Sequence, residues 1–148
     1  MALRALLTLT LGLIADLSLA SGDLTISDAW VRATPPGKMM TAAYASIENQ
    51  GSESVTVVGV SAAVAGHTSL HETRIERDRS TMRPVMRLTI DPGKRASLQP
   101  GGLHIMLMKL NESLNEGQSI DICFELENND GLCSVFPVAK HRSPAHRH

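Results

Sequence analysis

Short runs in which apolar and polar residues alternate make up most of the chain, and turn residues separate one run from the next. The run 120–126 alternates most regularly, and 55–60 is rich in β-branched side chains, which favour strands. Turn signals recur between the runs, as at 91–94 (Asp-Pro-Gly-Lys) and 128–131 (Asn-Asn-Asp-Gly). No long stretch after residue 20 has the helical period. The pattern predicts an all-β domain, an antiparallel sandwich or barrel of roughly seven to nine strands.

The two ends of the chain differ from this pattern. A basic start is followed by a mostly apolar stretch that ends in a small-x-small site, Ser-Leu-Ala at 18–20. These features predict a signal peptide over residues 1–20 and export to the periplasm. The alternative is that this stretch forms an N-terminal helix of the domain. Residues 21–140 then make up one domain, and the polar, proline-containing segment 141–148 is predicted to be a flexible tail. No later apolar run has the length of a membrane span, so no span is expected after cleavage.

The composition limits the classes of function that fit this chain. The 148 residues carry a formal net charge of -1, which argues against a nucleic-acid-binding protein, because such proteins are usually basic. The unusual feature is seven methionines and six histidines against two cysteines, since these side chains are soft and borderline metal ligands. Nucleotide-binding and serine-hydrolase motifs are absent, and His71-Glu72 lacks the second histidine of the H-E-x-x-H motif of zinc proteases. The protein is therefore not expected to be an enzyme.

The run 103–108 carries the first candidate ligands. Side chains alternate across a strand, so His104, Met106 and Met108 share one face of this run. Side chains two residues apart lie about 7 Å apart along a strand, close enough to lean toward one point. Imidazole and thioether groups together suit copper, and thioether favours Cu(I). The alternative is a core strand in which methionine fills gaps and His104 forms an internal hydrogen bond.

Two further candidates lie upstream. His71 belongs to the alternating run 69–75, and Met82 lies in an arginine-rich segment that predicts an exposed hairpin or loop. Ten residues separate His71 from Met82, and twenty-one separate Met82 from the His-x-Met triplet at 104–106. This spacing resembles the ligand signature of periplasmic copper chaperones of the PCu(A)C type.

The resemblance extends over about residues 28–138 and includes the opening segment 29–36, which leads to 42–44, and the segment 100–107. It implies a cupredoxin-like Greek-key β-barrel with one bound Cu(I). The ligands that it implies are His71, Met82, His104 and Met106. It also implies delivery of copper to the Cu(A) subunit of cytochrome c oxidase, often alongside a Sco-type protein. Two alternatives of other classes stay open: a periplasmic copper storage or buffering protein without a dedicated acceptor, and a sandwich module for protein interaction that binds no metal.

The cysteines and the tail histidines allow two interpretations each. Cys123 and Cys133 flank the last predicted hairpin and form either a disulfide or two unpaired thiols. The tail histidines His141, His146 and His148 either capture Cu(II) weakly or are solvated residues without a role.

The other methionines and one further histidine are expected to be structural. Met39 and Met40 could be reserve ligands or a docking surface, although packing or placement in a loop is the favoured interpretation. Met86 and Met108 are expected in the core. His67 is expected to be structural or at the surface.

Overall fold

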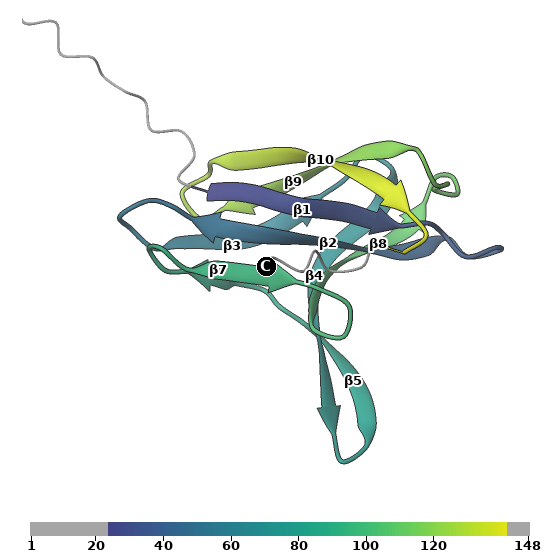
Figure 1. The fold of residues 1–148 in the computed structure, drawn as a ribbon, viewed down its shortest axis with the longest axis horizontal. Helices are drawn as coiled ribbons and strands as arrows, with labels where there is room; N and C mark the ends of the chain where they lie inside the picture. Colours follow the sequence, from purple (N-terminus) through teal and green to yellow (C-terminus); the bar gives the residue numbers. More distant parts are fainter. Residues whose placement is uncertain (1–23, 142–148) are drawn as a thin grey trace, which may run out of the picture.

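Residues 24–141 are the part of the chain that the computed structural model describes, and they form strands and turns (Figure 1). In chain order the strands are β1 (Leu24–Arg32), β2 (Met40–Asn49), β3 (Val55–Ser61), β4 (Ala65–Glu76), β5 (Arg79–Pro84), β6 (Leu88–Ile90), β7 (Arg95–Leu98), β8 (Leu103–Leu110), β9 (Ser119–Leu126) and β10 (Gly131–Ala139). The all-β prediction is confirmed. Among these residues no helix has the length and apolar character that a membrane span requires. The predicted signal peptide at 1–20 and the tail residues 142–148 lie outside the described residues.

All ten strands belong to one hydrogen-bonded sheet with the order β5-β4-β8-β7-β2-β1-β10-β9-β3-β6, and β8 also pairs with β2. The β1–β10 and β7–β8 pairs are parallel, and the other pairs are antiparallel. Several neighbours are distant in sequence, such as β4 with β8 and β3 with β9, as Greek-key connections require. Long-range pairing therefore decides which side chains meet.

The sheet closes around one apolar core because its strands are apolar on one face. Val31, Ile105 and Leu107 from one half of the sheet are fully buried in the same cluster as Phe124 and Phe136 from the other half. The alternation seen in the sequence marks this inner face. The outer face of β2, β4 and β8 is thereby left to polar and sulfur-containing side chains.

Strand β4 extends beyond the body of the domain. Its residues Ala65 to Glu72 pair with β8, and its residues His71 to Glu76 pair with β5. The β4–β5 hairpin projects away from the rest of the domain in Figure 1. The segment around Met82 is thus one strand of an exposed hairpin, and this strand brings the number of strands to ten.

Two methionines do not lie in the core, and that prediction is wrong. The segment 85–90 (Val-Met-Arg-Leu-Thr-Ile) reads as one strand with Met86 on the same face as Leu88, but only Leu88–Ile90 forms a strand, which pairs with β3. Met86 precedes this strand and is 75% exposed. Met108 lies partly buried on the outer face of β8, because Ile105 and its alternate neighbours occupy the core side.

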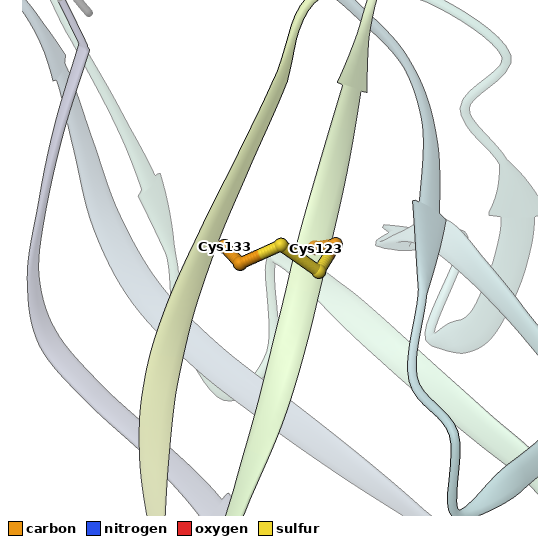
Figure 2. The surroundings of a disulfide bond; sticks show 2 residues. All are labelled: Cys123 and Cys133. Carbon is orange, nitrogen blue, oxygen red and sulfur yellow. A yellow bond between two sulfur atoms is a disulfide. The ribbon is translucent and has the colours of Figure 1, made fainter.

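A disulfide joins the last two strands (Figure 2). Cys123 of β9 and Cys133 of β10 are direct cross-strand partners, with Cα atoms 3.9 Å apart. The cysteines lie on the outer face, since Ile122 and Phe124 on either side of Cys123 point into the core. Of the two interpretations of the cysteines, the disulfide is the one observed.

Loss of this disulfide is expected to destabilise the fold. A cross-link between residues 10 apart restricts the unfolded chain, so replacing both Cys123 and Cys133 by serine lowers the free energy of unfolding by about 2–3 kcal/mol. Denaturant titration of this double variant beside the wild type measures the change. An unchanged midpoint at an unchanged m-value would contradict the expectation, and the intact mass before and after reduction and alkylation shows whether the wild type is bridged.

Candidate metal centre

The pairing of β4 with β8 brings the two predicted histidine ligands together. His71 is the direct cross-strand partner of His104, and their ring centroids are 6.1 Å apart. Two residues along, Ser69 is the partner of Met106. These four side chains lie on the outer face, since the alternate residues of both strands, such as Ile105, are buried in the core. Two parts of the sequence motif that are far apart in the chain, His71 and the triplet at 104–106, thus depend on one register.

The exposed hairpin supplies the remaining predicted ligand. Met82 of β5 is the cross-strand partner of Thr73, which lies two residues beyond His71 on the same face of β4. The side chain of Met82 is 51% exposed, whereas His104 is only 5% exposed. One ligand candidate therefore sits at the surface on a projecting element, and another is anchored in the sheet.

An open pocket of ≈ 320 Å³ lies over this face. Its lining residues are Arg32, Pro35, Met40, Thr41, Ala42, Tyr44, Thr73, Met82, Pro100, Gly101, His104 and Met106. Three of the four predicted ligands, Met82, His104 and Met106, line this pocket. His71 does not line it but stands beside it as the partner of His104.

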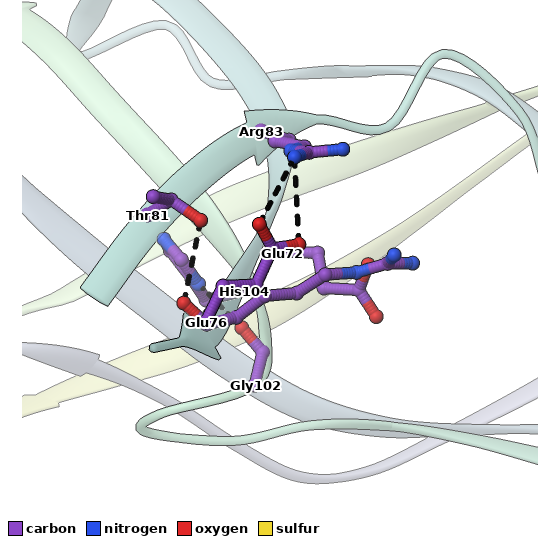
Figure 3. Close-up of polar contacts among 7 residues, drawn as sticks. Glu72, Glu76, Thr81, Arg83, Gly102 and His104 are labelled. Carbon is purple, nitrogen blue, oxygen red and sulfur yellow. Dashed lines mark hydrogen bonds and ion pairs between the residues drawn. The ribbon is translucent and has the colours of Figure 1, made fainter. Parts of the chain in front are cut away.

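The backbone fixes the orientation of His104 (Figure 3). Its Nδ1 lies 2.8 Å from the carbonyl oxygen of Gly102. A carbonyl oxygen only accepts hydrogen bonds, so Nδ1 carries the hydrogen and Nε2 keeps its lone pair. A second partner that holds one ring nitrogen in this way is the usual arrangement of a metal-binding histidine.

His71 has one nitrogen without a partner. Its Nε2 lies 2.9 Å from the hydroxyl oxygen of Ser69, while its Nδ1 is buried and has no hydrogen-bond partner among residues 24–141. Burial lowers the pKa of His71, and the neighbouring His104 and His67 lower it further. The neutral imidazole is the form that binds a metal. A buried nitrogen without a partner is costly unless something else occupies it, and a metal ion would do so.

The donor set decides which metal would fit. Within residues 24–141 no group of three or more His, Cys, Asp or Glu side chains is placed to hold a metal ion. Both cysteines of the chain are in the disulfide, so no thiolate is available. A metal at this pocket would therefore depend on thioethers, which bind Cu(I) and bind hard cations poorly.

Ion pairs along the hairpin help to position Met82. Nη2 of Arg83 donates to Glu76 at 3.4 Å (Figure 3). Nε of Arg74 donates to Glu72 at 2.6 Å. All four side chains are solvent-accessible, so each pair contributes at most about 1 kcal/mol. The hairpin is supported mainly by its backbone pairing with β4.

Nine of the twelve lining residues were not predicted as ligands, and three of these nine bear on the chemistry of the pocket. Met40 is 50% exposed and lines the pocket with Met82 and His104. Arg32 lies 5.6 Å from the ring centroid of Tyr44, and burial raises the pKa of Tyr44 while this guanidinium lowers it. Arg32 and Tyr44 belong to the segments that carry the family resemblance, which was the available signal. Met40 was considered as a reserve ligand or a docking surface, but packing or placement in a loop was the favoured interpretation.

Sequence comparison relates the chain to one family and to one protein of known sequence. The family model described as "Putative lipoprotein LpqE-like" matches residues 24–138. The protein "Putative lipoprotein Lxx21020" of Leifsonia xyli subsp. xyli is 40% identical over 115 residues, which is 77% of this chain. The match spans 66%, just under two thirds, of that relative's own length.

Solved structures relate the fold to PCuAC domains. The apo PCuAC domain from PmoF1 has a TM-score of 0.67 at 20% identity, covering 80% of this chain and 94% of that domain. The solution structure of CuI-DR1885 from Deinococcus radiodurans has a TM-score of 0.63 at 28% identity, covering 83% of this chain and 82% of that protein. The predicted cupredoxin-like fold and the predicted resemblance to PCu(A)C-type domains are confirmed.

The geometry of His104 predicts its tautomer. In the protein without copper, the Nδ1–H form is expected, because the Gly102 carbonyl oxygen accepts from Nδ1. Long-range ¹H–¹⁵N correlation spectra of the imidazoles at a pH above the histidine range distinguish the two tautomers directly. A protonated Nε2 in neutral His104 would contradict the hydrogen bond and remove the lone pair that faces the pocket.

Proposed function

This chain belongs to the LpqE-like family and has the fold of a PCuAC domain, and we propose that it is a copper chaperone that binds one Cu(I) ion at the pocket over β4, β5 and β8. The proposed ligands are His71, Met82, His104 and Met106. The observation that carries the proposal is the cross-strand histidine pair beside a pocket lined by two of these thioethers. DR1885, which is 28% identical, is described in a CuI form.

The ligand set suits transfer of the ion. Two imidazoles and two thioethers are neutral, so the site would keep the single charge of Cu(I). Met82 is half exposed on the projecting hairpin, and ligands of an acceptor could replace it first. The acceptor needs only a higher affinity, and each tenfold difference corresponds to about 1.4 kcal/mol. The specific acceptor that we propose is the Cu(A) subunit of cytochrome c oxidase, with a Sco-type protein as a further partner.

An exported location fits this role. The sequence at 1–20 has the pattern of a signal peptide, and disulfides such as Cys123–Cys133 persist mainly in oxidising compartments. The matched family and relative are both described as lipoproteins. We therefore place the protein in the periplasm. Capture of Cu(II) by the tail stays a prediction, because His146 and His148 lie outside the described residues.

Copper binding is tested by competition. Anaerobic titration against a chromophoric Cu(I) chelator is expected to show one tight equivalent in the wild type. Met106→Leu is expected to weaken it about tenfold or more, since one ligand is lost, and His104→Ala combined with Met106→Leu is expected to abolish it.

Met86→Leu is the matched control. It removes the same functional group at an exposed position outside the pocket, and the affinity is expected to stay within about twofold of the wild type. Equal affinities in the wild type and the double variant would remove these four side chains from consideration.

Delivery and buffering make different predictions. When the loaded protein is mixed with an apo Cu(A) domain under suitable redox conditions, the mixed-valence Cu(A) absorption is expected to develop. The same mixture with the double variant at 104 and 106 is expected to stay colourless, because that variant carries no copper. Normal Cu(I) binding without transfer would favour the buffering protein that the sequence left open.

A further inference from the structure

A second row of soft ligands lies beside the proposed site, across β4, β8 and β2. His67 of β4 is the direct cross-strand partner of Met108 of β8. On the other side of the same residue, Met108 is the partner of Met40 of β2. The three side chains therefore stand in one line across three adjacent strands.

All three side chains point to the outer face. The pairing of β4 with β8 is regular from His67 to Glu72, so His67 lies on the same side as His71. The residues that flank Met108 and Met40 on the inner side, Leu107 and Thr41, are buried. His67 and Met40 are exposed and Met108 is partly buried, so the row can be reached from solvent.

The side chains of His67, Met108 and Met40 are close enough to one another to bind one ion together. Directly opposite residues of paired strands have Cβ atoms about 5 Å apart. Methionine has three rotatable bonds and histidine two, so the three donor atoms can converge above Met108, the central residue. One imidazole and two thioethers form a neutral, soft set that suits Cu(I).

The row continues the pocket of the first site. Met108 lies two residues beyond Met106 on β8, which is about 7 Å along the strand. Met40 belongs to both places, since it pairs with Met108 and also lines the pocket with Met82 and Met106. An ion could pass from one set of donors to the other without leaving this face of the sheet.

We propose that His67, Met108 and Met40 form a second, weaker Cu(I) position next to the first. This inference rests on the proposed function in that Cu(I) is taken as the cargo. Three donors instead of four, two of them exposed, make this position the weaker of the two. It would hold copper on entry to or exit from the four-ligand site.

The methionine methyl groups report on both positions separately. In protein labelled with [methyl-¹³C]methionine and titrated anaerobically with Cu(I), the methyl signals of Met82 and Met106 are expected to shift with the first equivalent. The signal of Met108 is expected to shift with the second equivalent, together with Met40. Met86 is expected to stay unchanged throughout, because it lies outside both sets.

Variants at the row separate the two affinities. Met108→Leu keeps the volume of the side chain and is expected to weaken the second equivalent about tenfold or more, while the first changes less than about twofold. His67→Ala is expected to do the same. Met39→Leu is the matched control for Met40→Leu, because Met39 is the neighbouring residue, is 46% exposed and does not line the pocket.

The outcomes distinguish the two proposals. Shifts of Met82 and Met106 at one equivalent, with Met108 silent at higher copper, overturn the second position and leave the proposed function standing. Shifts of Met108 and Met40 alone support the row and overturn the four-ligand site. No response of any methyl signal overturns both.

Discussion

The register of β4 against β8 is the constraint on which the site depends. Side chains alternate between the two faces of a strand. A slip of one residue would therefore turn His71 toward the core, and His71 would no longer lie opposite His104. The register is held from the opposite face, where Leu70 and Ile105 are buried. Burial of each large aliphatic side chain contributes about 1.5–3 kcal/mol, far more than a polar contact at the surface. The apolar core therefore positions the imidazoles from the opposite face of the sheet.

The hairpin that carries Met82 is held differently. Among the strands that the structure describes, β5 pairs only with β4, and nearly all of its residues are exposed. A two-stranded ribbon without a core contact is marginally stable by itself, and exposed ion pairs such as Arg83–Glu76 add little. The site thus combines donors fixed in the sheet with one donor on the least supported element. A carrier that must release its ion benefits from this difference, because exchange can begin at the loosest ligand without disturbing the fold.

Alternation in the sequence was sufficient to predict an all-β domain and the shared face of His104 and Met106. It could not predict which strands lie side by side, because that depends on long-range pairing. For this reason the sequence could not predict that Met40 lies beside Met108. That position follows from the pairing of β2 with β8. The error at Met86 has a local cause. The pattern of residues 85–90 resembles a strand, but the pairing with β3 begins only at Leu88. The spacing of the predicted ligands led to the correct fold because the family that it resembles has this topology.

Charge explains why this face would favour a monovalent ion. Among the described residues that line the pocket none is acidic, and Arg32, which lies 5.6 Å from the ring centroid of Tyr44, contributes a positive charge. Repulsion from Arg32 doubles when a bound ion carries two charges instead of one. Hard divalent cations also lack the oxygen donors that they require, whereas thioethers remain good donors for Cu(I) without any negative charge. Selectivity at the proposed site would therefore come from the lack of carboxylates among the residues that line the pocket as well as from the thioethers. Carboxylates would strengthen binding, but they would also admit competing ions and slow the release of copper.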